Sequence, residues 1–198
     1  MSLKNITNFI FELNQLKRLR HNGFQHAGVQ YPDSVAEHVY RAAQIGYILA
    51  IMEGDANPEK VTTILLIHDN AETRVGDQNK VAARYYSKKR SRKQGLSRTT
   101  NAFAERNRKK WQKYFQEFES RNTKEGIIAK DADWLEQAFQ AKEYLELGYQ
   151  AAQNWIDNVE KALETKSAQK ILKEMKKTSF TSWWQNLKKM TYTKINKK

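Results

Sequence analysis

Large apolar side chains recur three or four positions apart through most of this chain, a spacing typical of helices that bury one face. The pattern predicts an amphipathic helix over residues 6–20. Residues 21–33 contain two glycines and a proline and are expected to form a loop. Ser34 and Glu37 then match a capping box, so a second helix is predicted from this point to Gly54.

The rest of the chain continues the helical spacing, with one interruption. A third helix is predicted to begin near Pro58, because proline is favoured in a first turn, and to carry His68. Residues 80–110 hold many Lys and Arg and few large apolar residues, which favours a flexible basic connection. The remaining predictions are a helix bearing Phe103, Trp111, Tyr114, Phe115 and Phe118, another from Asn122 or Thr123 to Leu147, one or two helices within 149–176, and a terminal segment around Trp183 and Trp184 docked on the bundle.

The composition favours a single all-α domain spanning residues 1–198. That length is sufficient to bury a core, and two prolines and eight glycines suit helices better than sheets. With no cysteine, the chain excludes disulfides, thiolate zinc sites and cysteine nucleophiles. We find neither a secretory signal pattern nor an apolar run approaching the ~20 residues of a spanning helix. A cytoplasmic protein without a membrane segment is therefore expected.

The net charge of +13 adds an expectation about partners. A field of this sign concentrates anions such as nucleotides, nucleic acid or acidic lipid headgroups, without choosing among them. Lys and Arg are densest in the basic segment, residues 84–110. This segment is predicted either to bind polyanions weakly or to be a mobile, solvated loop, and the residues leave both interpretations open.

The candidate chemistry begins at His68 and Asp69, which stand side by side after the apolar run 64–67. Burying such a pair is costly unless a partner compensates it. One interpretation is a core histidine hydrogen-bonded to a neighbouring acid. The other is a divalent transition metal, because Mn, Co, Ni, Fe and Zn ions accept imidazole and carboxylate ligands. Glu72 and Asp77 follow within a few turns and could handle a water molecule.

Two other places in the sequence could complete a metal site. His38 falls early in the second helix, and Asp131 and Asp133 lie in the long helix. Because helix neighbours point about 100° apart, helical periodicity puts Asp131 on the main apolar stripe and Asp133 nearly opposite. A second apolar flank indicates that this helix is buried nearly all round. The periodicity therefore favours Asp131 without excluding Asp133.

In their order along the chain, these motifs resemble those of the HD-domain metal-dependent phosphohydrolases. The similarity is closest to the branch that includes 5'-deoxynucleotidases, and it covers most of the chain. The motifs that carry it are Ser34-Val35-Ala36-Glu37-His38, His68-Asp69-x-x-Glu72, Gly76-Asp77, Asp131-Ala132-Asp133-Trp134-Leu135-Glu136, Lys17-Arg18-Leu19 before Gly23-Phe24, and Trp183-Trp184.

The resemblance implies a fold, an activity and a set of site residues. The fold is an HD-domain-like helical bundle, and the activity is metal-dependent hydrolysis of phosphomonoesters, with nucleoside 5'-monophosphates as the expected substrates. A homodimer is implied as well. The implied metal ligands are His38, His68, Asp69 and Asp133, the implied catalytic residues are Glu72 and Asp77, and the implied substrate-binding residues are Arg18, Phe24, Asp77 and Lys80.

The chain departs from the branch in two places that concern the substrate. The first-loop aromatic residue is typically a Trp preceded by a phosphate-binding Arg, whereas Phe24 occupies this place here. The loop after Asp77, which usually contains proline, reads Gln78-Asn79-Lys80. His21 and His26 are interpreted as exposed loop histidines, with substrate contact as the alternative. All five tryptophans are interpreted as packing residues.

A rival interpretation comes from a different class of protein. The chain could be a basic helical module that binds RNA or DNA, with a structural or vestigial metal site. The presence of Glu72 and Asp77 favours an enzyme, because a purely structural site has no need of additional acids around it.

Overall fold

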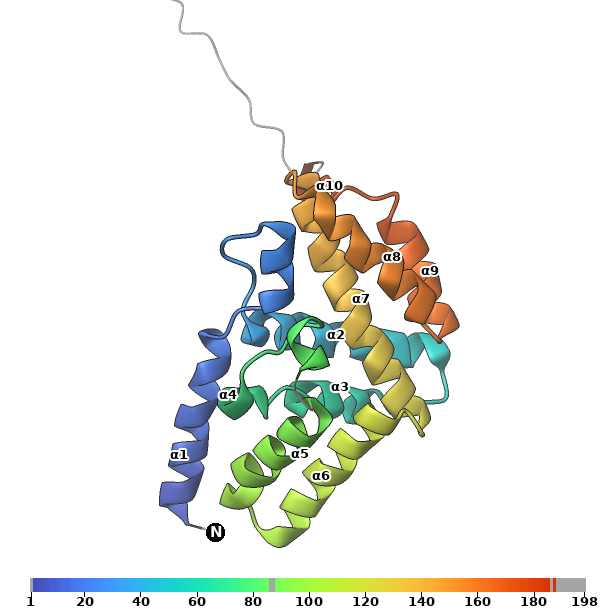
Figure 1. Cartoon of the computed structure of the whole chain (residues 1–198). Coiled ribbons are helices and arrows are strands. Elements are labelled where there is room, and N and C mark those ends of the chain that lie inside the picture. The colour runs from blue at the N-terminus through green and yellow to red at the C-terminus, as the bar shows by residue number, and fades with distance from the viewer. Residues whose placement is uncertain (1, 86–87, 186, 188–198) are drawn as a thin grey trace, which may run out of the picture.

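The computed structural model describes residues 2–85, 88–185 and 187, and this part of the chain is all-helical, without a named strand (Figure 1). The predicted all-α fold class is thereby confirmed. In chain order, with η marking 3-10 helices, the elements are α1 (Leu3–Leu13), η1 (Asn14–Lys17), η2 (Asn22–Ala27), α2 (Val35–Glu53), α3 (Pro58–Ile67), α4 (Glu72–Val75), η3 (Ala82–Arg84), α5 (Lys88–Thr99), η4 (Thr100–Ala102), α6 (Glu105–Ser120), α7 (Lys124–Glu146), η5 (Gln150–Ala152), α8 (Gln153–Ala162), α9 (Lys166–Met175) and α10 (Ser182–Gln185).

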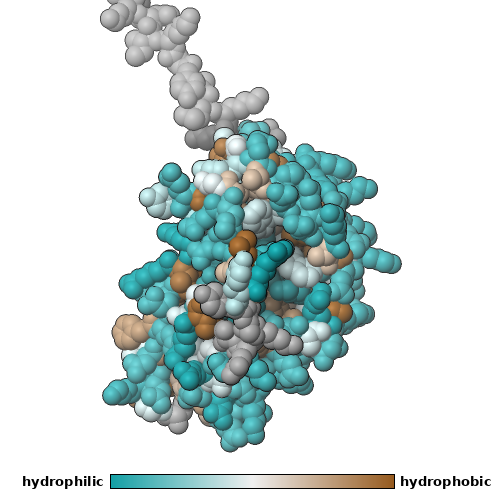
Figure 2. Space-filling view, in the orientation of Figure 1, coloured by the Kyte–Doolittle hydropathy of each residue, from teal (hydrophilic) through white to brown (hydrophobic). Residues whose placement is uncertain are grey.

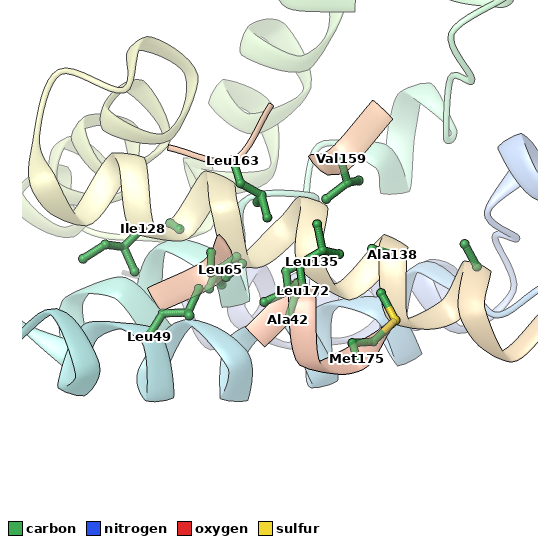
Figure 3. Close-up of a cluster of buried hydrophobic side chains, with 14 of the residues drawn as sticks. Ala42, Leu49, Leu65, Ile128, Leu135, Ala138, Val159, Leu163, Leu172 and Met175 are labelled. Atoms are coloured by element: carbon green, nitrogen blue, oxygen red, sulfur yellow. The ribbon is translucent and has the colours of Figure 1, made fainter. Parts of the chain in front are cut away.

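The long helix α7 runs through the middle of the molecule and packs against both α2 and α3 (Figure 1). Helices α8 and α9 also pack against α7, and α9 contacts α2 as well. Figure 3 shows the apolar side chains that fill the space between these helices, among them Leu49, Leu65, Leu135 and Leu172. Helix α7 buries residues on nearly every side, as its two apolar flanks predicted.

The helix ends follow the local signals that were read from the sequence. The hydroxyl of Ser34 accepts a hydrogen bond from the Glu37 amide, and the Glu37 carboxylate accepts one from the Ser34 amide, which completes the capping box of α2. Helix α2 ends at Gly54, which has a positive φ of 81°. Pro58 opens α3, and Thr123 caps α7. These predicted boundaries are confirmed.

The prediction of a flexible basic connection was wrong, because part of that segment forms α5. Leu96 of this helix makes a small core with Ala71 and Phe115. Gly95 permits the close approach, since an added Cβ would lie 3.0 Å from the Ala71 carbonyl oxygen. With Leu96 as its one buried large apolar residue, α5 shows little apolar periodicity in the sequence. The side chains of residues 86–91 lie outside the part that is described.

The two ends of the chain also differ from expectation. The first helix is α-helical only from residue 3 to residue 13 and continues as a 3-10 helix to residue 17. Trp183 and Trp184 are 73% and 50% exposed, so the prediction that they dock on the bundle was wrong. They belong to α10, a helix of four residues with no buried side chain. The other three tryptophans are partly buried, as their interpretation as packing residues requires.

The surface is mostly polar on the face shown in Figure 2, with single apolar side chains scattered over it. Among the described residues, no helix combines the length and the apolar character that crossing a membrane requires. The single-domain prediction includes residues 188–198, which lie outside the described part, and it stays a prediction.

Candidate metal centre

Four side chains converge where α2, the end of α3 and α7 meet. His38 lies in the first turn of α2, directly after the capping box. His68 and Asp69 follow the last residue of α3, and Asp133 lies on α7. The Nε2 atom of His38 is 3.3 Å from Asp133 Oδ1 and 3.8 Å from Asp69 Oδ2. The Nε2 atom of His68 is 3.1 Å from Asp69 Oδ2 and 3.9 Å from Asp133 Oδ1.

Hydrogen bonds on the outer side of each histidine fix which ring nitrogen faces inward. His38 Nδ1 donates to the carboxylate of Glu136, which is itself held by Arg41 at 2.9 Å. His68 Nδ1 donates to the Leu65 carbonyl oxygen at 2.6 Å. With Nδ1 protonated, Nε2 of each ring carries the lone pair, and both Nε2 atoms are buried without a hydrogen-bond partner. This arrangement is typical of metal-ligating histidines.

Each of the two carboxylates is held by a cation through one oxygen and faces the histidines with the other. Arg92 donates to Asp69 Oδ1 at 2.6 Å, while Asp69 Oδ2 faces inward. Lys130 donates to Asp133 Oδ2 at 2.8 Å. Asp133 Oδ1 faces His38 and also accepts a hydrogen bond from Gln137 at 3.0 Å.

The four inward atoms fit a divalent transition ion. Ligands about 2.1 Å from one ion lie about 3.0–3.4 Å from one another. The shortest of the measured separations, 3.1 Å and 3.3 Å, lie in that range, and the others are somewhat longer. Two imidazoles and two carboxylates also form a donor set that such ions accept, and it leaves positions for water or substrate. The predicted divalent metal is consistent with these residues, which do not identify the element.

The electrostatics keep the acids of the site charged. Burial alone would raise the pKa of Asp133, but Lys130 and the two histidines outweigh it and hold that pKa well below its ordinary value. Burial is likewise outweighed at Asp69, where His68 and Arg92 lower the pKa. For His38, burial would lower the pKa, but Glu136 and Asp133 raise it well above 6.5. The site is thus a buried cluster whose negative charge attracts a cation or, in its absence, a proton.

Asp131, the acid that helical periodicity favoured, lies away from this cluster. Its carboxylate accepts hydrogen bonds from the backbone amides of Glu164 and Thr165 and from the Thr165 hydroxyl. Asp131 therefore joins the turn between α8 and α9 to α7. Burial raises its pKa above the ordinary value. Asp133, which the family resemblance favoured, is the acid that the structure brings to the two histidines.

Glu72 and Asp77, the two predicted catalytic residues, follow His68 and Asp69 along the chain, at the start of α4 and just after it. Glu72 begins α4 and is buried, and its amide donates to the Asp69 carbonyl oxygen at 2.9 Å. Gly76 follows α4 with a φ of 72°, which favours glycine and turns the chain at this point. Asp77 Oδ2 then accepts a hydrogen bond from the Asn22 amide at 2.8 Å. Asp77 therefore anchors the start of η2 beside the cluster.

The predicted substrate-binding residues occupy different environments. Arg18 and Lys80 are exposed. Phe24 is 1% exposed, and its ring stacks on Trp155 with centroids 5.0 Å apart. In this conformation Phe24 has a packing role and offers no surface to a ligand, so its predicted contact with substrate finds no support here.

His21, which the sequence predicted to be an exposed loop histidine, lies beside His38 instead. Its ring centroid lies 4.4 Å from that of His38, and its Nδ1 atom is 3.1 Å from Asp33 Oδ2. Together with His38 and Asp69 it also makes a group whose ligand atoms could hold an ion. Burial and His38 would lower the pKa of His21, but Asp33 raises it overall. His26, by contrast, is exposed, as expected.

Comparison with known proteins identifies the family. A profile described as "HD domain" matches residues 13–176. The chain belongs to the HD-domain family. The 5'-deoxynucleotidase HDDC2 of Danio rerio is 31% identical over 149 residues, which is 73% of this chain and 72% of that protein. The Dictyostelium discoideum protein of the same name is 31% identical over 151 residues, covering 72% of this chain and 78% of the relative.

Solved structures share this fold. A conserved hypothetical protein from Pyrococcus furiosus matches with a TM-score of 0.73 and 29% identity, over 87% of this chain and 99% of that one. A predicted metal-dependent phosphohydrolase from Magnetospirillum magnetotacticum matches with a TM-score of 0.66 over 88% of this chain and 91% of that one, and at 18% identity it supports the fold alone. The family match and the relatives confirm the prediction of an HD-type metal-dependent phosphohydrolase and do not favour the nucleic-acid-binding alternative.

Proposed function

We propose that this protein releases phosphate from nucleoside 5'-monophosphates, with deoxynucleotides as the first substrates to test. The observation that carries the proposal is the convergence of two unpartnered imidazole nitrogens and two carboxylates, with the buried Glu72 three residues after Asp69 and hydrogen-bonded to its carbonyl oxygen through the backbone. The nucleotide part rests on the relatives, which are named as 5'-deoxynucleotidases. His38, His68, Asp69 and Asp133 are the proposed metal ligands.

A divalent ion held by these four residues would supply Lewis acidity, which would activate water and polarise a phosphoryl group. The chain's own residues then have separate tasks. Glu136 and the Leu65 carbonyl hold the two histidines with Nε2 inward. Glu72, one turn after His68, is the proposed general base that accepts a proton from the attacking water, or the acid that donates one to the leaving oxygen.

The substrate is proposed to approach over the loop between η1 and α2 and the turn after Gly76. These two segments are joined, because Asn22 donates both its amide and its side chain to Asp77. The exposed side chains of Arg18 and Lys80 lie in the same two segments and could neutralise phosphate charge. Asp77 is proposed to hold these two segments together through Asn22 and to contact the sugar or an attacking water.

A chelation experiment with a substrate panel tests the proposal. Purified protein is treated with EDTA, dialysed, and assayed for phosphate release from deoxynucleoside and ribonucleoside 5'-monophosphates, 3'-monophosphates and p-nitrophenyl phosphate. We expect chelation to abolish release and Mn²⁺, Co²⁺ or Ni²⁺ to restore it, with 5'-monophosphates preferred. A protein that binds no transition ion and releases phosphate from none of these esters would contradict the proposal.

We also propose that two copies pair through an apolar strip on α2 and α3. The exposed side chains of the strip surround a hollow of about 430 Å³, and none of its lining residues is charged. In a chain of net charge +13, an uncharged strip is where two copies can approach with little repulsion. Its members are Tyr40, Ala43, Gln44, Tyr47, Ile48, Thr62 and Leu66.

Sedimentation analysis of wild type and of Ile48→Lys tests the pairing. We expect a dimer for the wild type and a monomer for Ile48→Lys, because the substitution places two like charges in the paired strip. A monomeric wild type at micromolar concentration would refute the pairing. A cytoplasmic location remains a prediction of the sequence.

A further inference from the structure

Arg92 is a buried cation that belongs to no part of the mechanism described above. It lies on α5 and is 7% exposed. Its guanidinium donates to Asp69 Oδ1 at 2.6 Å, to the His68 carbonyl oxygen at 2.7 Å and to Glu119 at 3.0 Å. Arg92 therefore contacts two consecutive proposed metal ligands: the side chain of Asp69 and the backbone of His68.

The burial of this guanidinium needs a reason. Removing an isolated charge from water costs several kcal/mol, and good pairing geometry is required to offset that cost. The guanidinium also lies near the rings of Phe115 and Phe118, at 5.5 and 6.0 Å from their centroids. Arginine stays charged at every physiological pH, so its positive charge is a permanent part of the site.

The permanent charge decides which oxygens of the site are available to a metal ion. Sites with two metal ions hold them about 3.5–4 Å apart, and a carboxylate can join such a pair by giving one oxygen to each ion. At Asp69 one oxygen faces the histidines and the other is taken by Arg92. At Asp133 the oxygen that does not face the histidines is taken by Lys130. Both outer oxygens are therefore held by cations of the protein.

We propose that Arg92 is a built-in cation that holds the outer oxygen of Asp69 and so limits the site to one metal ion. Arg92 is a positioning residue in this account, because it acts on a ligand and not on the substrate. Its charge lies at the outer oxygen of Asp69, so a second cation bridged to the first through Asp69 would be repelled there and left without that oxygen. The inference rests on the metal site of the proposed function and specifies its stoichiometry.

Metal stoichiometry in folded protein tests this directly. Wild type, Arg92→Lys, Arg92→Gln and Arg92→Glu are dialysed against increasing Mn²⁺, and bound metal per chain is measured by mass spectrometry. We expect one ion for wild type and for Arg92→Lys, which keeps the charge. Arg92→Gln frees the Asp69 oxygen and should bind a second ion at high Mn²⁺, while Arg92→Glu adds a carboxylate and should bind two ions more readily.

Electron paramagnetic resonance of the same samples supplies a readout that a merely structural role would not change. Two Mn²⁺ ions a few ångströms apart give a spin-coupled spectrum, which we expect only for Arg92→Gln and Arg92→Glu. The matched control is Arg98→Glu, which makes the same charge change on the exposed part of α5 and should keep one uncoupled ion. Circular dichroism confirms that each variant is folded.

Each result either supports or overturns the inference. A coupled pair of ions in the wild type would overturn it, whether or not the variants fold. Folded Arg92→Gln and Arg92→Glu that both saturate at one ion would overturn it as well. A wild type that binds no ion would instead overturn the proposed metal site, so failure of this inference is distinguishable from failure of the proposed function.

Discussion

The α2–α3–α7 centre and the α4–α5 side of the molecule meet at one site but are held together by different interactions. The centre is a continuous apolar core that α8 and α9 extend. The α4–α5 side has a small apolar cluster, made by Ala71, Leu96 and Phe115, and polar ties that include the ion pairs of Arg92 with Asp69 and Glu119 and of Arg74 with Glu12. The centre positions the histidines, and the α4–α5 side positions a charge.

This difference explains why the helices of the centre were predicted from the sequence and α5 was not. An apolar core leaves a periodic pattern, because every buried face repeats with the helix. An ion-paired arginine leaves none, because Arg92 is surrounded in the sequence by other basic residues. A basic segment can therefore contain a residue that is directed into a site, as Arg92 is, while Lys93 and Gln94 next to it are exposed.

The largest effect is expected from His68→Ala, which removes a proposed ligand from the end of α3. Bound metal and phosphate release should both fall to the level of the chelated protein, because the neighbouring ligands cannot replace an inward imidazole nitrogen. Metal analysis and the phosphate assay are run on the same sample. His26→Ala removes an exposed histidine and should change neither quantity. Full metal occupancy in His68→Ala would remove this residue from the ligand set.

Glu72→Gln should separate chemistry from metal binding on the α4 side. We expect kcat to fall by about 10²–10⁴-fold, because the amide cannot exchange a proton with water or the leaving group. Bound metal should stay at the wild-type level. Glu59→Gln, which neutralises an exposed glutamate of α3, is the control and should change neither kcat nor bound metal. If Glu72→Gln loses its metal, Glu72 is itself a ligand, and the α4 side takes part in metal binding as well as in proton transfer.

Glu136→Gln tests how far the centre depends on the hydrogen bond behind His38. The amide should hold the imidazole less firmly and lower its basicity, so metal affinity should fall about 10–100-fold. Glu143→Gln removes a different contact of the same Arg41 and leaves His38 untouched, which makes it the matched control. Equal affinities in the two variants, measured by competition with a metal indicator, would show that the His38–Glu136 bond has no role in metal binding.

Gly95→Ala tests whether α5 packs closely against α4. Helix propensity alone would make the substitution stabilising by about 1 kcal/mol. The added methyl would lie 3.0 Å from the Ala71 carbonyl oxygen, so we expect the sign to reverse, with a loss of about 1–2 kcal/mol in the free energy of unfolding. Gln94→Ala on the exposed side of α5 should be nearly neutral. A more stable Gly95→Ala protein in urea unfolding would contradict the close packing.

The smallest effect is expected from the exposed part of the basic segment. Replacing Lys93, Arg98, Lys109 and Lys110 with Gln, and leaving Arg92 in place, should lower kcat/KM up to about tenfold at low salt and leave kcat nearly unchanged. Weak polyanion binding would appear instead as an affinity for DNA that falls steeply with salt, with a slope of about −0.9 per phosphate neutralised. Identical salt titrations for both proteins would show that these residues serve solubility alone.

Most of the fold could be predicted from the sequence because residues at the helix ends determine where the helices begin. Ser34, Pro58 and Thr123 each satisfy or replace backbone donors at the place where a helix begins, independently of the rest of the molecule. The ends of the chain were predicted less well, because no local signal says whether Trp183 or Trp184 finds a partner surface.

The site was predictable only in part, because its geometry depends on contacts between distant residues. Helical periodicity favoured Asp131, whereas the family motif favoured Asp133, and both proved to be buried on α7. His21 was interpreted as an exposed loop residue. Its place beside His38 depends on the loop returning to α2, where the His21 amide donates to the Asp33 carbonyl oxygen. Helical periodicity does not predict how a loop folds back onto a helix.

The most direct test of the account compares bound metal in Asp133→Asn and Asp131→Asn. Both substitutions remove one charge from a buried acid of α7, and the two positions are separated by a single residue. We expect folded Asp133→Asn to lose its ion, and Asp131→Asn to keep it and be only less stable, because the Asp131 carboxylate holds the turn between α8 and α9. Full occupancy in Asp133→Asn together with an empty site in Asp131→Asn would contradict the proposed metal centre.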